Sequence, residues 1–133
     1  MKHPEFTLLD GAMGTMLQAA GLGMGELPES WNLTHPDMVS DIHRAYYDAG
    51  SNVVSTNTFG ANILKFDRDE LRRIIEAAVE NVRRAKEQSS SSGERFIALD
   101  IGPIGKLLKP YGDYEFEDAV SVYSETVKIG AAC

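Results

Sequence analysis

Residues 6–15 read FTLLDGAMGT, in which an apolar strand stops on an acid–glycine turn at Asp10 and Gly11. Two further stretches have the same form, VVSTNTFG at 53–60 and FIALDIGP at 96–103. α/β enzymes place their polar chemistry at the C-terminal ends of strands, and glycine there lets backbone N–H groups approach a ligand closely. The three stretches therefore predict one active-site face, and an incomplete one.

The composition predicts a single soluble, cytoplasmic domain. The chain has 133 residues, of which 43% are hydrophobic, enough for one core. Its 20 acidic and 13 basic side chains give a net charge of -7 without a dense basic cluster, which argues against a nucleic-acid partner. No apolar run approaches the roughly 20 residues that span a bilayer, and the N-terminus lacks a signal-peptide core. The single cysteine, Cys133, excludes an internal disulfide and fits a reducing compartment.

Three long helices are expected between and after these strands. The first opens near Thr34, which begins a capping pattern, and ends at Gly50. The second covers about 69–88 and is capped by Asp67, and the third begins after Asp113. The side chains expected on the apolar face of the third helix are Phe116, Ala119, Val120, Tyr123 and Val127.

The order of elements, β-α-β-α-β-α with strands of near-continuous apolar character, indicates parallel pairing and right-handed crossovers. Two architectures fit this order, a doubly wound open sheet and part of a (β/α)8 barrel. The turn at Gly11 and Gly14 does not favour a dinucleotide-binding fold, because the third glycine of that fingerprint is missing. Residues 21–33 carry three glycines and are expected to form a loop.

Four segments of the chain carry a recognisable family pattern. They are LDGAMGTM at 9–16, NLTHP at 32–36, AGSNVVSTNTFGAN at 49–62 and GPIGKLLKP at 102–110. In sequence and order they resemble the homocysteine S-methyltransferase family, and the last two are most similar to its cobalamin-dependent methionine synthase branch. The resemblance implies that residues 1–133 are the N-terminal portion of a homocysteine-binding barrel domain. This portion would be the first three βα units of a TIM (β/α)8 barrel, with parallel strands in the order 1-2-3.

The resemblance also implies a chemistry, the transfer of a methyl group to the zinc-activated thiol of homocysteine to give methionine. A thiol with a pKa of about 8.5 is a poor nucleophile at neutral pH, and zinc deprotonates it. The family's three zinc-binding cysteines follow its sixth and eighth strands, and Cys133 matches none of them. Zinc and methylcobalamin are therefore expected in the complete enzyme. Neither zinc nor methylcobalamin is expected to bind this chain alone. The chain alone is therefore expected to be inactive.

The substrate-binding residues implied by the resemblance lie in the first two turns: Asp10, Gly11, Thr56, Asn57 and Thr58. Two roles are open for Asp10, a contact to the ammonium group or backbone of homocysteine and an N-cap for a helix that starts near Met13. Asn57 and Thr58 also suit hydrogen bonds that stabilise a turn. Asp100 suits a turn at least as well as a ligand contact.

No catalytic or metal-ligating residue is expected in this chain. Its histidines, His3, His35 and His43, lack the i, i+4 spacing of metal ligands. Four aromatic residues are expected to pack in the core or between helix and sheet rather than to stack on a ligand: Tyr46, Tyr47, Phe59 and Phe96. The resemblance nevertheless implies that the turn from Thr56 to Phe59 lines the substrate site.

A second function also fits the pattern, a stand-alone flavodoxin-like domain that binds a small molecule or regulates without catalysis. A strand order of 2-1-3 would indicate that alternative. In a barrel fragment, three strands leave two open edges and unpacked apolar side chains. The expected partners are therefore homocysteine and either the missing C-terminal barrel strands or further copies of the chain as a homo-oligomer, with no nucleic acid and no membrane.

Overall fold

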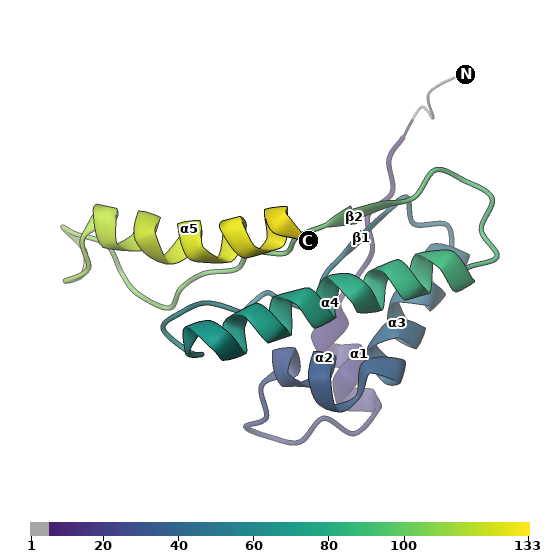
Figure 1. Cartoon of the computed structure of the whole chain (residues 1–133), viewed down its shortest axis with the longest axis horizontal. Helices are drawn as coiled ribbons and strands as arrows, with labels where there is room; N and C mark the ends of the chain where they lie inside the picture. Colours follow the sequence, from purple (N-terminus) through teal and green to yellow (C-terminus); the bar gives the residue numbers. More distant parts are fainter. Residues whose placement is uncertain (1–5) are drawn as a thin grey trace.

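The computed structural model describes residues 6–133, which form two short strands and several helices (Figure 1). In chain order the elements are α1 (Met13–Ala19), the 3₁₀ turn η1 (Pro28–Ser30), α2 (Trp31–Thr34), α3 (Pro36–Asp48), β1 (Val53–Ser55), α4 (Arg68–Gln88), β2 (Phe96–Ala98) and α5 (Phe116–Ala132). Helix α4 lies between α5 on one side and α2 and α3 on the other, and it packs against all three. None of the helices in residues 6–133 is long and apolar enough to cross a membrane.

The sheet of the described residues contains two parallel strands, β1 and β2, with Val54 opposite Ile97. β1 stops where the sequence predicts, at Ser55, and β2 stops at Ala98, one residue before the predicted end at Leu99. Parallel strands end at the same edge of a sheet, so the polar turns that follow β1 and β2 lie next to each other.

The segment expected as the first strand, residues 6–10, is not a strand in this structure. Only Leu9 forms a bridge, parallel to Val53. The adjoining backbone bonds run to the β1 side, from Asp10 N–H to the Val53 carbonyl at 3.0 Å and from Asn52 N–H to the Leu8 carbonyl at 2.8 Å. Because the pairing is limited to this one bridge, the expectation of three strands in the order 1-2-3 is not confirmed.

The core that holds the strand ends joins α3, β1 and α4. Tyr47, Val54, Val82 and Ala85 form one fully buried cluster across these elements. Burying each large apolar side chain contributes roughly 1.5–3 kcal/mol to folding. The Tyr47 hydroxyl donates to the Phe96 carbonyl at 2.7 Å, and burial raises the pKa of Tyr47 to about 12. The same side chain thus fastens α3 to both strands, and the expectation that it packs in the core is confirmed.

Local capping signals were right at two helix ends and wrong at one. The Asp67 side chain accepts from the backbone N–H of the third residue of α4 at 2.9 Å, as the capping pattern predicts. Gly50 follows α3 with a φ of +109°, the left-handed conformation that glycine adopts freely. Thr34, however, does not cap α3, which begins at Pro36 without a side-chain cap. Its hydroxyl donates instead to the Ser30 carbonyl at 3.2 Å, because Thr34 is the last residue of α2.

Two other expectations are wrong. The segment 21–33 is not wholly a loop, since it contains η1 and most of α2. The predicted apolar face of α5 is also mostly exposed, with Phe116, Val120 and Val127 on the surface. The reason is that α5 is covered on its other side, by α4 through a cluster that includes Ile129 and by Ile104 through a second cluster. The buried residues of α5 are Ala119, Val122, Thr126 and Ile129.

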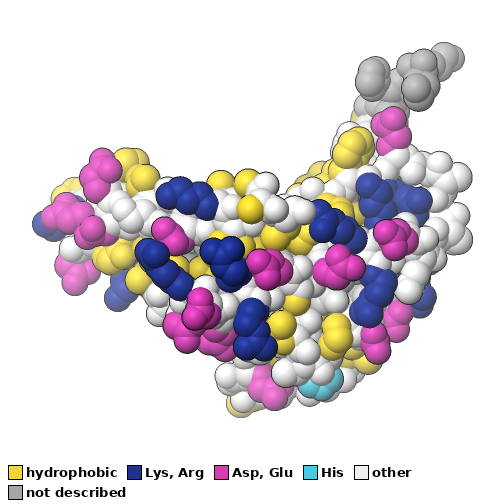
Figure 2. All heavy atoms as spheres, viewed as in Figure 1, with side chains coloured by type: hydrophobic (Ala, Val, Ile, Leu, Met, Phe, Trp, Pro, Cys, Tyr) yellow, Lys and Arg dark blue, Asp and Glu magenta, His cyan; other side chains and the backbone are white. Residues whose placement is uncertain are grey.

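An exposed apolar surface runs along the strand region. Leu8, Leu9 and Phe96 are 57%, 67% and 53% exposed. The expectation that Phe96 packs in the core is therefore wrong. By contrast, Figure 2 shows basic and acidic side chains interspersed over the face that carries α4. Exposed apolar side chains at a sheet edge are typical of regions that associate with other polypeptide.

From this surface we expect the chain to self-associate, and Leu8→Lys to weaken that association. A lysine at a sheet edge opposes strand pairing because its charge would be buried in the contact. Sedimentation velocity at micromolar concentration measures the effect, with Met24→Lys as the control because Met24 is fully exposed in a distant loop. A wild-type chain that sediments as a compact monomer would contradict the expectation.

The free energy of unfolding is also expected to depend on pH through His43. This side chain of α3 is fully buried, and neither ring nitrogen has a hydrogen-bond partner within residues 6–133. Burial lowers the pKa of His43 from 6.5 to about 4. As pH falls from 6.5 to 4 the unfolded chain binds a proton that the folded chain does not, so stability decreases, by a total on the order of 3 kcal/mol.

Denaturant titrations at pH 7 and pH 5 test this dependence. We expect His43→Leu to lose less stability than the wild type between these pH values, whereas His35→Leu, which changes an exposed ring, should behave like the wild type. An equal loss in the wild type and in His43→Leu would show that His43 does not contribute.

Candidate functional site

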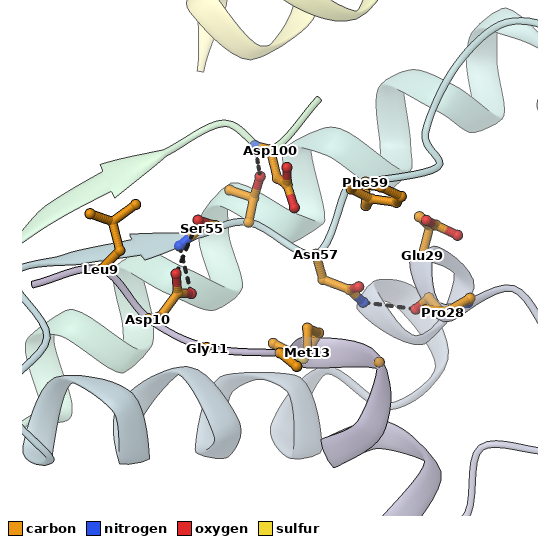
Figure 3. Close-up of a pocket in the computed structure, with 13 residues that line it drawn as sticks. Leu9, Asp10, Gly11, Met13, Pro28, Glu29, Ser55, Asn57, Phe59 and Asp100 are labelled. Carbon is orange, nitrogen blue, oxygen red and sulfur yellow. Dashed lines mark hydrogen bonds between the residues drawn. The ribbon is translucent and has the colours of Figure 1, made fainter. Parts of the chain in front are cut away.

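A cavity of about 450 Å³ lies at the C-terminal ends of β1 and β2, beside the start of α1 (Figure 3). Residues from all three polar turns identified in the sequence line this cavity. Residues of η1 line it as well. The polar or charged residues that line it are Asp10, Glu29, Ser55, Thr56, Asn57 and Asp100. The cavity therefore lies where the sequence predicts an active-site face.

The Asp10 carboxylate is fixed by β1. Its Oδ2 accepts from the backbone N–H of Ser55 at 2.8 Å, and its Oδ1 accepts from the Ser55 hydroxyl at 3.1 Å. The proposed capping role is wrong, because the N-cap of α1 is Ala12 and no side chain caps that helix. A carboxylate has about four acceptor positions. Asp10 thus uses two of them on Ser55, and its carboxylate also lines the cavity.

Gly11 lines the same cavity and lets α3 approach the first turn. A Cβ at this position would lie 3.1 Å from Oη of Tyr46 and 3.2 Å from its ring. The Tyr46 hydroxyl donates to the Ala12 carbonyl at 2.9 Å. The glycine therefore allows a direct tether between α3 and the turn that carries Asp10.

Thr56 and Thr58 connect the β1 turn to the β2 turn. The Thr58 hydroxyl donates to the Asp100 carbonyl at 2.7 Å, and the Thr56 hydroxyl oxygen accepts from Asp100 N–H at 3.1 Å. The two hydroxyls lie 2.7 Å apart. Since the Thr58 proton is already donated, Thr56 is the donor in this contact. Thr56 lines the cavity, whereas Thr58 is fully buried behind it.

Asn57 lines the cavity while it joins the β1 turn to η1 and α2. Its side-chain amide donates to the Pro28 carbonyl at 2.7 Å (Figure 3), and its own carbonyl accepts from the Asn32 side chain at 2.7 Å. Asn32 is in turn held from α4, because Asn81 donates to its carbonyl at 3.1 Å. Asn57 therefore fixes one wall of the cavity.

The cavity is electrically negative. Burial raises the pKa of the Asp100 carboxyl above its ordinary range, and the nearby charges of Asp10 and Glu29 raise it further against the opposing effect of the Ile101 N–H. Among the described lining residues there is no lysine, arginine or histidine. This field favours a small ligand that carries a positive group.

Sequence reasoning missed several lining residues, among them Ser55 and the two residues from η1. Glu29 and Pro28 come from the segment expected as a loop, and the one local signal was the proline at the first helical position. The resemblance implied that the turn from Thr56 to Phe59 lines the site, whereas the residue type of Phe59 favoured packing in the core or against the sheet; Phe59 is 60% exposed and lines the cavity. Gly102 forces this placement, because its N–H donates to the Phe59 carbonyl at 2.9 Å and a Cβ there would overlap that carbonyl.

The residues present do not fit a zinc ion. Within the part of the chain that the structure describes, no group of three or more His, Cys, Asp or Glu side chains could hold a metal. Cys133 lies at the end of α5, where its thiol donates to the Ile129 carbonyl at 3.3 Å, and it does not line the main cavity. We therefore derive no step through zinc for these residues.

The fold resembles that of a solved enzyme. The crystal structure of the homocysteine methyltransferase MmuM from Escherichia coli, in its metallated form, matches with a TM-score of 0.80 and 22% sequence identity. The match covers 95% of this chain and 50% of that one. At this identity the likeness concerns the fold, an α/β arrangement that matches a TIM-barrel protein.

Sequence relatives and a family model give the assignment. A methionine synthase from Mycobacterium tuberculosis is 36% identical over 127 residues, which are 87% of this chain and 11% of the relative. A homocysteine S-methyltransferase from Escherichia coli is 28% identical over 131 residues, 89% of this chain and 42% of the relative. The chain thus spans less than half the length of both relatives. The family model described as homocysteine S-methyltransferase matches residues 7–133, and the chain belongs to that family.

Proposed function

We propose that this chain supplies part of the homocysteine-binding cavity of a methyltransferase of the methionine synthase type. In this proposal residues 1–133 are the first three βα units of the barrel, and the complete enzyme acts in the cytoplasm. The observation that carries the proposal is the convergence of Asp10, Gly11 and the β1 turn on one negatively charged cavity. The family match over residues 7–133 supports it.

Homocysteine offers a positive ammonium group, a carboxylate and a thiol. Asp10 keeps acceptor positions toward the cavity after binding Ser55, so it would accept from the ammonium group. Gly11 lets the backbone of its turn approach the amino-acid end of the ligand. Thr56 and Asn57 would form the adjoining wall, and Thr58 would support that wall from behind.

The reaction itself belongs to the complete enzyme. The homocysteine sulfur would lose its proton and form a bond to the methyl carbon, while the electron pair of the broken bond stays on the methyl donor. Zinc lowers the pKa of a bound thiol, and methylcobalamin is the donor that the family resemblance implies. Both groups would be held by parts of the enzyme other than the residues described here, so we expect this chain alone to be inactive.

A stand-alone flavodoxin-like function is less well supported. No observation in the structure favours it specifically, whereas the fold matches 95% of this chain to half of a homocysteine methyltransferase.

Replacing Asp10 tests the proposal. We expect Asp10→Asn to weaken homocysteine binding by about 1.5–3 kcal/mol, because a neutral amide removes a charge-assisted hydrogen bond to the ammonium group. Titration calorimetry with L-homocysteine measures this change on the 133-residue chain.

Asp67→Ala is the control, because Asp67 also accepts from a backbone N–H but caps α4 and does not line the cavity, and alanine removes that cap. This control should lower the melting temperature without changing homocysteine affinity. If Asp10→Asn behaved in the same way, Asp10 would be a structural residue.

A further inference from the structure

Glu29 is an acid buried beside the cavity with one clear contact. The residue is 4% exposed, and its Oε1 accepts from the backbone N–H of Gly60 at 2.6 Å. Its Oε2 has no hydrogen-bond partner within residues 6–133. Burying a carboxylate is costly. Within the described residues, the carboxylate of Glu29 therefore makes one hydrogen bond, which it accepts from the Gly60 N–H.

Gly60 is shaped for this contact. A Cβ at this position would lie 2.6 Å from Oε1 of Glu29 and 2.7 Å from Nζ of Lys65, so a larger residue would displace the carboxylate. Gly60 is itself buried, and its N–H would lose its hydrogen bond without Glu29. An unpaired buried N–H is unfavourable enough to move the backbone that carries it.

The residue before Gly60 is Phe59, which lines the cavity beside Glu29 (Figure 3). Phe59 is held from the β2 side, where its carbonyl accepts from Gly102 N–H. On the other side, the bond from Gly60 to Glu29 attaches the same turn to η1. The ring of Phe59 thus faces the cavity, while hydrogen bonds to Gly102 and to Glu29 hold the backbone that carries it.

We propose that Glu29 is a positioning residue of the ligand cavity, which acts by holding Gly60 so that the Phe59 ring forms the apolar wall for the methylene groups of homocysteine. This inference rests on the proposed function for its ligand. The role needs an acceptor rather than a charge, because Oε2 adds no hydrogen bond within the described residues. Glutamine should therefore replace glutamate, and alanine should not.

The first experiment compares Glu29→Ala and Glu29→Gln in the 133-residue chain. Calorimetry with L-homocysteine should show an affinity loss of about tenfold for Glu29→Ala and less than about twofold for Glu29→Gln. The control is Glu26→Ala, because Glu26 also accepts from a glycine N–H, that of Gly23 at 2.9 Å, but is exposed and outside the cavity. This control should bind homocysteine as the wild type does.

A double-mutant cycle separates positioning from general destabilisation. If Glu29 acts through Phe59, Glu29→Ala should add little to the affinity loss of Phe59→Ala, since the wall that it positions is already gone. Additive losses would overturn the proposal. So would a Glu29→Gln variant that binds as weakly as Glu29→Ala, because the charge would then be the required feature.

Hydrogen exchange of the Gly60 amide gives a readout that needs no ligand. Exchange should be faster in Glu29→Ala than in the wild type and unchanged in Glu29→Gln. An equal rate in all three would overturn the proposed hold on Gly60. If the wild type binds no homocysteine, the proposed function fails, while the exchange rates still decide whether Glu29 holds this turn.

Discussion

A ring of hydrogen bonds between Thr56, Thr58 and the backbone of Asp100 connects the ends of β1 and β2. Each strand has three residues, so the strand ladder alone offers few bonds to fix the two turns. The two threonines are buried, and removing either hydroxyl would leave a buried polar group without a partner, at a cost of about 1–3 kcal/mol. The cavity keeps its shape because the turns that form it cannot move independently.

Elements with a complete local signal could be predicted from the sequence. Helix α4 has an apolar stripe and a capping aspartate, Asp67, and both its existence and its start agree with the structure. Residues 6–10 have the apolar pattern of a strand, but a strand also requires a paired neighbour along its length. Here one bridge forms, at Leu9, so the pattern alone did not predict the outcome. Thr34 shows the opposite problem. It begins a capping motif, but its hydroxyl donates to the Ser30 carbonyl of the preceding turn and does not cap α3. α5 carried apolar residues on two sides, and its contacts with α4 and with Ile104 decided which side is buried.

The candidate site divides in the same way. Asp10, Gly11, Thr56 and Asn57 were predicted from the family resemblance, and each lies in a polar turn that follows an apolar segment. All four line one cavity, whereas Thr58, which was predicted with them, is buried behind it. Their contact with substrate stays a prediction. Glu29 could not be found from the sequence, because it meets Gly60 across 31 positions of the chain and no periodicity records that contact. Phe59 looked like a core residue since aromatic side chains usually pack inside, but backbone bonds on both sides leave its ring in the cavity.

The charge of the cavity and the proposed ligand constrain each other. Asp10, Glu29 and Asp100 lie close enough that the first two raise the pKa of the Asp100 carboxyl. An ammonium group placed among them would favour the ionised form of Asp100 and lower that pKa again. By linkage, a ligand that lowers the pKa of a group binds more tightly once that group has lost its proton. The same field disfavours a thiol that carries a carboxylate without an ammonium group, since nothing would then offset the repulsion. Under the proposed function, selection of an α-amino acid over other small thiols thus originates in the carboxylates of Asp10 and Asp100, before any chemistry at sulfur begins.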